Sequence, residues 1–305
     1  MNISVIIPAC NESASIGTLV SQIKSLYPDS EVIIINDGST DETAAVAKAS
    51  GAIVYSHPYN IGNGAAIKSG IRIAKGDVLI FMDGDGQHNP HDIPKLLYEL
   101  SCFDMVVGAR PKEGQSSYIR GVGNKIYNML ASYVAKFNIL DLTSGFRAIR
   151  ADIAKRFVYL LPNTYSYPTT LTLCVLRSGF SIKYIPIIVE KRKKGASKIK
   201  IFNDGIRFLM VIMKIATLFS PLRIFVPISF FMILLGSINY FYSYLTQGRF
   251  TNMSALLFTT SFLIFMMGLI SEQICQMRFE RSEGERKFND LKIFEKDSSQ
   301  NKIAP

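Results

Sequence analysis

The stretch Val78-Leu79-Ile80-Phe81-Met82-Asp83-Gly84-Asp85-Gly86-Gln87-His88 decides the fold. Its first five residues are apolar and include β-branched and aromatic side chains, a pattern typical of a strand buried on both faces of a parallel sheet. In open α/β sheets, ligands bind beyond the carboxyl ends of the strands. The polar residues that follow Met82 therefore stand at the predicted ligand-binding edge.

Similar short apolar runs occur on both sides of this strand, and helical patterns separate them. The further predicted strands are residues 3–8, 32–36, 53–56 and 105–108, with 182–189 joining later. Amphipathic stretches at 14–26, 43–49 and 65–74 have the spacing of βαβ units. We therefore predict an α/β domain with a mostly parallel, Rossmann-like sheet covered by helices on both faces.

Asp83 and Asp85 are separated by a single glycine. Two carboxylates this close repel each other unless a cation lies between them. Oxygen ligands without sulfur favour Mg²⁺ or Mn²⁺, which bind through one or two carboxylates plus substrate phosphates. Gln87 offers a further oxygen ligand. The alternative is an ordinary turn, but the position directly after a buried strand favours a metal and diphosphate site.

The first two predicted strands also end in polar residues. The first leads into Pro8, Asn11 and Glu12, and the second into Asp37. We expect Asp37 to accept hydrogen bonds from a base or ribose. The alternative for this second loop is a helix start, because Ser39 and Glu42 have the spacing of a capping box.

The three histidines give no metal signal by position. Asn89-Pro90 separates His88 from His91 and prevents a regular helical face, so we expect surface histidines in a turn. His57 is similarly unremarkable. Near it, Gly62-Asn63-Gly64 opens a predicted helix whose backbone N–H groups could bind a phosphate, or could form only a loop.

The C-terminal third contains two long apolar segments. Residues 224–246 and 250–271 contain no charged residue, and each exceeds the roughly 20 residues that cross a bilayer. Basic residues flank both outer ends, whereas Arg249 is the single charged residue of the connecting loop. The positive-inside rule therefore predicts a hairpin with both outer ends in the cytoplasm. Two buried core helices are the less favoured alternative.

The formal charge of +10 is concentrated beside these segments. Between Lys183 and Arg223 there are ten Lys or Arg residues against two acidic residues. Basic residues at an anionic membrane surface contribute about 1 kcal/mol each. A membrane surface is therefore the preferred partner, and nucleic acid is disfavoured. The four dispersed cysteines and the absence of a visible secretory signal lead us to expect a cytosolic first domain.

Six ordered motifs together resemble glycosyltransferase family 2. They are Pro8-x-x-Asn11-Glu12, Asp37-Gly38-Ser39, Gly62-Asn63-Gly64, Asp83-Gly84-Asp85-Gly86-Gln87-His88, Thr143-Ser144-Gly145-Phe146-Arg147 and Gly195-Ala196-Ser197-Lys198. Within the family, the chain is most similar to the polyprenyl-phosphate glycosyltransferases, the group of dolichol-phosphate mannosyltransferase and its bacterial glucosyltransferase relatives. The likeness covers about residues 1–275. Gly84 and Gly86 depart from the Ala and Leu common in relatives, which leaves the ligands intact but blurs the choice of sugar.

The resemblance implies a GT-A fold and an inverting, metal-dependent transfer of a hexose from UDP-glucose or GDP-mannose to a polyprenyl phosphate on the cytoplasmic leaflet. It implies Mg²⁺ or Mn²⁺ as cofactor. The roles it assigns are catalytic for Asp85, Asp141 and Arg110; nucleotide-binding for Pro8, Asn11, Glu12, Asp37 and Asp83; metal-binding for Asp83, Asp85 and Gln87; and acceptor-phosphate-binding for Arg120, Arg147, Arg192, Ser197 and Lys198. Asp141 is expected to orient the acceptor or to act as a base. The alternative for the basic motif around Ser197 is a generic membrane-binding patch.

The expected organisation is a cytoplasmic GT-A domain at 1–200, juxtamembrane amphipathic helices at 201–222 and two transmembrane helices within 223–275, at about 224–246 and 250–272. A cytoplasmic, partly mobile tail follows at 276–305. Two other functions stay open. A processive polysaccharide synthase is disfavoured because such enzymes use a Gln-x-x-Arg-Trp motif and this chain has no tryptophan. A catalytically silent nucleotide-binding membrane adaptor is the second. The sugar, the nucleotide to which it is linked, and the oligomeric state, for which a tetramer is possible, stay undecided.

Overall fold

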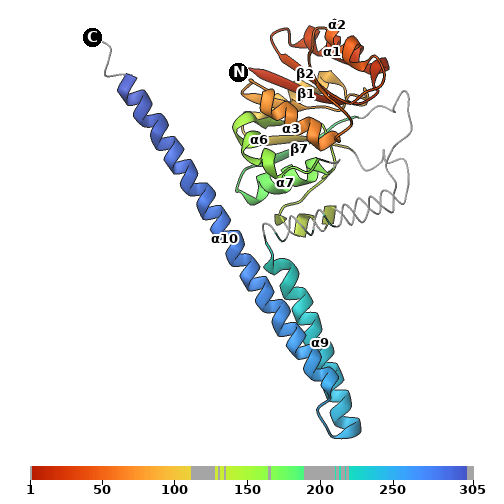
Figure 1. Ribbon diagram of the computed structural model, residues 1–305, viewed down its shortest axis with the longest axis vertical. Coiled ribbons are helices and arrows are strands. Elements are labelled where there is room, and N and C mark those ends of the chain that lie inside the picture. Colours follow the sequence, from red (N-terminus) through yellow and green to blue (C-terminus); the bar gives the residue numbers. More distant parts are fainter. Residues whose placement is uncertain are drawn as a thin grey trace. The chain divides into compact units, whose positions relative to one another are not determined.

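The computed structural model describes residues 2–110, 128–129, 131–133, 135–163, 166–188, 210, 213, 217 and 220–300, with side chains described to residue 277. The chain divides into two compact units, residues 1–212 and 213–305. Each unit is considered by itself (Figure 1).

The first unit is built on a seven-stranded sheet in the order β3-β2-β1-β4-β6-β5-β7. The strands are β1 (Ile3–Ala9), β2 (Glu31–Asp37), β3 (Ile53–His57), β4 (Val78–Phe81), β5 (Met105–Ala109), β6 (Arg147–Arg150) and β7 (Ile182–Pro186). β1 pairs in parallel with β2 and β4, and β2 pairs in parallel with β3. The carboxyl ends of β1, β2 and β4 therefore meet at one edge, as the sequence predicts.

β6 is the strand that the sequence pattern does not predict. Its four residues, Arg-Ala-Ile-Arg, are too few and too polar at their ends to stand out. β6 lies antiparallel between β4 and β5, with Phe81 opposite Arg147 and Val107 opposite the same arginine. This insertion brings the segment before residue 147 next to the turn that follows β4.

Helices cover both faces of the sheet, as predicted (Figure 1). Buried side chains of α1 (Ser13–Leu26) and α4 (Ile93–Leu100) share one core cluster with alternate residues of the strands, such as Val5, Ile7 and Ile80. On the other face, Gly70 of α3 (Asn63–Ile73) meets Ile6, and Tyr167 of α7 (Tyr167–Arg177) packs edge-on against Phe81. Among the described residues of this unit, the structure also has the helices α2 (Thr43–Ala49), η1 (Pro90–Asp92), α6 (Ala151–Phe157) and η3 (Val158–Leu160).

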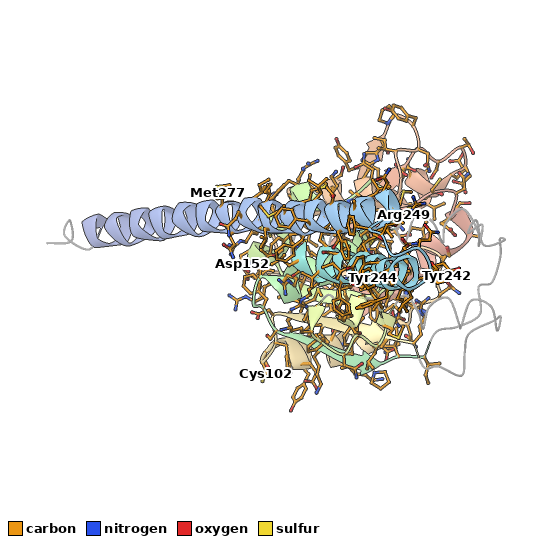
Figure 2. The ribbon with its side chains drawn as sticks, turned by 90° about the horizontal axis from the view of Figure 1, so that it is seen from below. Cys102, Asp152, Tyr242, Tyr244, Arg249 and Met277 are labelled. Carbon is orange, nitrogen blue, oxygen red and sulfur yellow. The ribbon has the colours of Figure 1, made fainter. Side chains whose placement is uncertain are left out.

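The second unit contains a helical hairpin. α9 (Leu222–Gln247) and α10 (Asn252–Gln300) lie side by side, and the segments Leu222–Gln247 and Asn252–Met277 are long and apolar enough to cross a membrane. Figure 2 labels Tyr242, Tyr244 and Arg249 near the connecting loop, where aromatic side chains suit a lipid–water interface.

Small and polar residues join the two helices of the hairpin. Ser229 and Ser261 are buried, and the hydroxyl of each donates to the other's backbone carbonyl, at 2.9 and 2.7 Å. Gly268 lies so close to α9 that a Cβ there would be 2.7 Å from Cβ of Phe225. Close approach at small residues is how helices associate in lipid, where apolar side chains gain little from leaving it.

The segment predicted as interfacial helices, 201–222, lies almost entirely outside the described residues. α10 continues as a helix past the predicted end of the second span, to Gln300.

Candidate functional site

The turn after β4 is the centre of the candidate site. Gly86 has a φ of +71°, which favours glycine. The hydroxyl of Ser15, in α1, donates to the carbonyl of Gly84 at 2.8 Å, and the backbone N–H of Gln87 donates to Oδ1 of Asp85 at 3.1 Å. Asp85 and Gln87 are both half-buried in this turn. Two hydrogen bonds therefore hold the turn: one is within it, to the Asp85 carboxylate, and one comes from Ser15 of the neighbouring helix α1.

Asp83 is contacted by His88 from the same turn and lies close to Gly145, which is distant in the sequence. A Cβ added at Gly145 would be 2.6 Å from Oδ2 of Asp83, so only glycine fits there. Nε2 of His88 is 3.4 Å from the same oxygen. Burial raises the pKa of Asp83, but the hydrogen bond from His88 and nearby positive charges outweigh it, so the pKa lies below its ordinary value. The side chain stays a carboxylate suited to a cation.

The donor set of this turn fits a hard divalent cation. Asp83 and Asp85 supply carboxylate oxygens and Gln87 an amide oxygen, with no sulfur. Within the part of the chain that the structure describes, no group of three or more His, Cys, Asp or Glu gathers into a complete metal site. This suits Mg²⁺ or Mn²⁺ held by one or two carboxylates, with substrate phosphates completing the coordination.

Arg110 and Asp141 form a bidentate ion pair beside this turn. Nε of Arg110 donates to Oδ2 of Asp141 at 2.8 Å and Nη2 donates to Oδ1 at 3.0 Å. The Asp141 side chain is 10% exposed and that of Arg110 is 40% exposed. Burial raises the pKa of Asp141, but its hydrogen bonds and the charge of Arg110 lower it below the ordinary value. A carboxylate with a lowered pKa is a weak base, and both oxygens of Asp141 are bonded to Arg110, which favours an orienting role over the expected role as a base; the base role stays a prediction.

The loops after β1 and β2 are tied to each other. Asn11 has a φ of +60°, and its Oδ1 accepts from the backbone N–H of Thr40 at 2.8 Å. Its own N–H donates to Oγ of Ser39 at 3.0 Å. The N–H of Glu12 donates to Oγ1 of Thr43 at 2.9 Å. Asn11 is exposed, whereas Pro8 and Glu12 are half-buried at the same edge.

The alternative interpretation of Ser39 and Glu42 as a capping box is wrong. α2 begins at Thr43, whose N–H donates to Oδ1 of Asp41 at 3.1 Å, and Glu42 makes no side-chain cap. Ser39 instead joins the two loops, because its hydroxyl oxygen accepts a hydrogen bond from the N–H of Asn11.

Asp37 is placed differently from the prediction. Its side chain is 4% exposed, and both oxygens accept from protein donors: Oδ1 from the N–H of Ile61 at 2.9 Å, and Oδ2 from that of Gly62 at 2.8 Å. Nδ1 of His57 lies 2.7 Å from Oδ1. These contacts favour a structural role for Asp37, and its expected role in binding a base or ribose stays a prediction. Asp37 accepts from the N–H groups of the glycine-rich loop that precedes α3. Its negative charge therefore lies at the N-terminus of this helix, where it would repel a phosphate.

Arg147 is likewise not at the surface. Its side chain is fully buried and donates to the carbonyl of Pro168 at 3.0 Å, to Oγ1 of Thr172 at 3.1 Å and to the carbonyl of Ser144. Its donors join the segment before β6 to α7, which favours a structural role; the predicted binding of an acceptor phosphate stays a prediction. Arg120, Arg192, Ser197 and Lys198 lie outside the described residues.

Two histidines that the sequence treats as unremarkable belong to the site. His57 and His88 are 8% and 7% exposed, so the expectation of surface histidines in the turn is wrong for His88 and correct for His91, which is exposed. His57 bridges Asp37 and Ser69, with Nε2 2.9 Å from Oγ of Ser69. His88 is the last residue of the Asp83–His88 motif, and His57 lies close to the glycine-rich loop. Neither position reveals burial, which depends on contacts with residues further along the chain such as Phe146 and Ser69.

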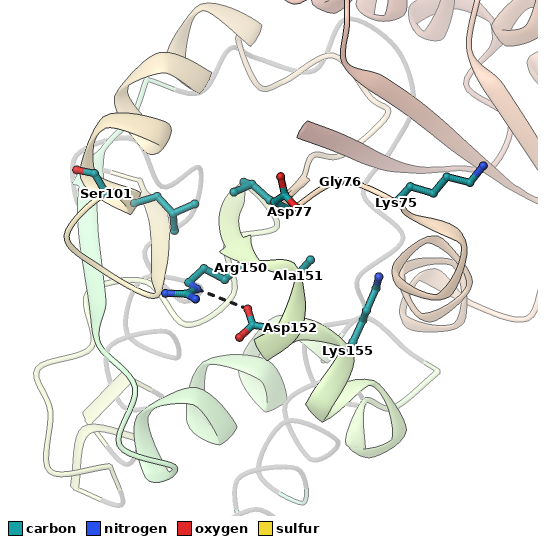
Figure 3. A pocket seen from close by; sticks show the side chains of 10 residues that line it. Lys75, Gly76, Asp77, Ser101, Arg150, Ala151, Asp152 and Lys155 are labelled. Atoms are coloured by element: carbon teal, nitrogen blue, oxygen red, sulfur yellow. Dashed lines mark ion pairs between the residues drawn. The ribbon is translucent and has the colours of Figure 1, made fainter. Parts of the chain in front are cut away.

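A separate pocket lies at the opposite edge of the sheet (Figure 3). It is lined by residues 75–78, 100, 101, 150–152 and 155, and Nε of Arg150 is 3.5 Å from Oδ1 of Asp152. None of the predicted site residues lines it.

A mostly parallel sheet with a carboxylate turn at its ligand-binding edge defines a glycosyltransferase of the GT-A fold. The chain belongs to glycosyl transferase family 2, whose model matches residues 4–158, and the model of the GtrB C-terminal hairpin matches residues 220–277. The hairpin indicates association with a membrane.

Relatives and solved structures agree with this assignment. The chain is 29% identical to an undecaprenyl-phosphate mannosyltransferase from Micrococcus luteus, over 65% of this chain and 87% of the relative. It is 28% identical to the putative glycosyltransferase CsbB from Bacillus subtilis, over 91% and 88%. The fold resembles a Mycobacterium tuberculosis glucosyl-3-phosphoglycerate synthase solved with Mn²⁺, UDP and phosphoglyceric acid, with a TM-score of 0.57, 21% identity and coverage of 70% and 78%.

Proposed function

We propose that this protein transfers a hexose from a nucleotide sugar to a polyprenyl phosphate at the cytoplasmic leaflet, with inversion, and that the donor is UDP-glucose or GDP-mannose. The observation that carries the proposal is the pairing of the Asp83–Asp85 turn with the Arg110–Asp141 ion pair on a family 2 domain whose chain also contains an apolar hairpin. The relative from Micrococcus luteus is named for a polyprenyl-phosphate acceptor, which supports the same class of acceptor here.

The chemistry requires stabilisation of a departing nucleoside diphosphate. A bound Mg²⁺ or Mn²⁺ would supply Lewis-acid stabilisation of the diphosphate, and Asp83, Asp85 and Gln87 are the residues proposed to hold it. Arg110 is oriented by Asp141 and Thr143, which accept from Nε and Nη2, and it is proposed to contact the phosphates through its remaining guanidinium N–H groups in a charge-assisted hydrogen bond. Pro8, Asn11 and Glu12 are proposed to line the nucleotide side of the site.

The acceptor needs little help in losing a proton. A phosphate monoester has a second pKa of about 6, so a lipid phosphate is mostly dianionic at neutral pH. This agrees with the lowered pKa of Asp141, which makes that residue a poor proton acceptor. Arg120, Arg192, Ser197 and Lys198 are proposed as acceptor-phosphate residues. Domain boundaries at about 200 and 222 and a cytoplasmic placement of both termini belong to the same proposal.

The test is a donor panel with the full chain in detergent. UDP- and GDP-linked sugars are incubated with Mg²⁺ or Mn²⁺ and undecaprenyl phosphate, and the glycolipid is detected by mass spectrometry. We expect one donor to be consumed and the Asp85→Ala variant to be inactive. The proposal fails if no donor is consumed and Asp85→Ala behaves like the parent. Binding of nucleotide without turnover would favour the membrane adaptor, and a growing polymer would favour a synthase.

A further inference from the structure

His88 has no role in the proposed transfer, yet its side chain is buried. It is 7% exposed, and its imidazole stacks on the ring of Phe146 with centroids 5.1 Å apart and planes 17° from parallel. Stacking on Phe146 fixes the plane of the imidazole ring, and the ring nitrogens lie in that plane.

That orientation directs one nitrogen at Asp83. Nε2 lies 3.4 Å from Oδ2, whereas Nδ1 is buried and has no hydrogen-bond partner. Burying a nitrogen without a partner is unfavourable. An apolar side chain would fill the same space without burying an unpartnered nitrogen. The contact between Nε2 and Asp83 is therefore the feature that distinguishes a histidine from an apolar residue at this position.

The same carboxylate oxygen is confined from the other side. Gly145 leaves room for it, since a Cβ at that position would be 2.6 Å from Oδ2. Gly145 and Phe146 are consecutive residues, so one short segment before β6 both makes room for Asp83 and carries the ring that holds His88. The antiparallel pairing of β4 and β6 brings the two parts together.

We infer that His88 is a positioning residue: supported by Phe146, it fixes the orientation of the Asp83 carboxylate toward the metal and diphosphate. The inference rests on the proposed function, since it gives Asp83 its proposed ligand. Residues that orient ligands in this way typically contribute about 10- to 100-fold to metal affinity.

The experiment separates the ring from its nitrogen. His88→Phe keeps an aromatic ring for stacking and loses the nitrogen. His88→Gln loses the ring and can place an amide N–H near the position of Nε2, whereas His88→Asn is too short to reach it. The exposed His91→Phe is the matched control. Binding of Mn²⁺ to the full chain in detergent is measured by electron paramagnetic resonance, with UDP or GDP present, and folding by thermal melting.

We expect His88→Phe and His88→Asn to weaken Mn²⁺ binding about 10- to 100-fold, and His88→Gln to stay within about threefold of the parent. If the Phe variant fails to fold, the comparison of Gln with Asn decides. The inference is overturned if the folded Phe variant binds like His91→Phe, or if Gln and Asn bind equally. Failure of the parent to bind Mn²⁺ with either nucleotide would instead remove the proposed function, and the inference with it.

Discussion

Both carboxylate oxygens of Asp141 accept hydrogen bonds from Arg110, and Nη2 of the same arginine also donates to Oγ1 of Thr143 at 2.6 Å. The guanidinium is therefore fixed by two residues of the segment that precedes β6. An arginine fixed before substrate arrives loses little entropy when it binds a phosphate.

Replacing Asp141 by Asn tests this orientation. Asn keeps the size of the side chain and removes the charge that pairs with Arg110, so we expect the transfer rate to fall about 10- to 100-fold. The rate is measured at saturating donor and acceptor. Asp152→Asn is the control, because that carboxylate lies in an exposed ion pair with Arg150. Equal activity of the two variants would contradict the assigned role.

The same pair predicts how stability depends on acid. The pKa of Asp141 is lowered from its ordinary value of 3.8, so its contribution to the free energy of unfolding is complete above that value and is lost as pH falls through the folded pKa. We therefore expect the parent to be more stable than Asp141→Asn at neutral pH, and the difference to shrink only below about pH 4. Denaturant unfolding of both proteins across this range checks it. A difference that shrinks between neutral pH and pH 5 would contradict the lowered pKa.

Gly145→Ala is expected to displace Asp83. The new Cβ would lie 2.6 Å from Oδ2, so the carboxylate must move. We expect metal-dependent nucleotide binding to weaken by about tenfold or more, as measured by calorimetry. Gly51→Ala is the control, because nothing lies within 4 Å of a Cβ there although its φ is +90°. That control should lose some thermal stability and keep its affinity.

Arg147→Lys is expected to affect folding and not the acceptor. A lysine cannot donate to Pro168 and Thr172 with the planar geometry of a guanidinium, so buried acceptors lose partners, at a cost of about 1–3 kcal/mol in the free energy of unfolding. Chemical denaturation measures the loss. Titration with polyprenyl phosphate at a temperature where the variant stays folded should give an unchanged KM. A raised KM without lost stability would restore the predicted phosphate role.

Gly268→Leu is expected to separate the helices of the hairpin. Its Cβ would be 2.7 Å from Cβ of Phe225, so the larger side chain forces α9 and α10 apart, at a cost of about 1–3 kcal/mol. We expect a lower melting temperature in detergent and lower transfer to the lipid, while nucleotide binding persists. Leu263→Ala, at a position that is 58% exposed, is the control and should change neither property strongly.

The predicted strands and the hairpin agree with the structure because each depends on a local pattern. Runs such as Val78–Phe81 bury every residue, and apolar segments of membrane length are visible without knowing their neighbours. The position of the carboxylate turn was predictable because it follows such a strand. β6 was not predictable from the sequence, because four residues with an arginine at each end are too few to show a hydrophobic period.

The roles of individual polar residues were predicted less well. Asp37 and Arg147 lie in motifs that the resemblance assigns to ligands, and the structure surrounds both with protein partners. His88 gave the opposite error, because it was read as a surface histidine and is buried against Phe146. In each case the deciding partners come from another part of the chain.

The sequence by itself determined the α/β class, the carboxylate turn at a strand end and the apolar hairpin, because hydrophobic period and segment length are properties of neighbouring residues. Only the tertiary structure decided which polar side chains face the site. Burial and hydrogen-bond partners arise when β6 inserts beside β4 and places Gly145 against Asp83, a contact that no local pattern encodes.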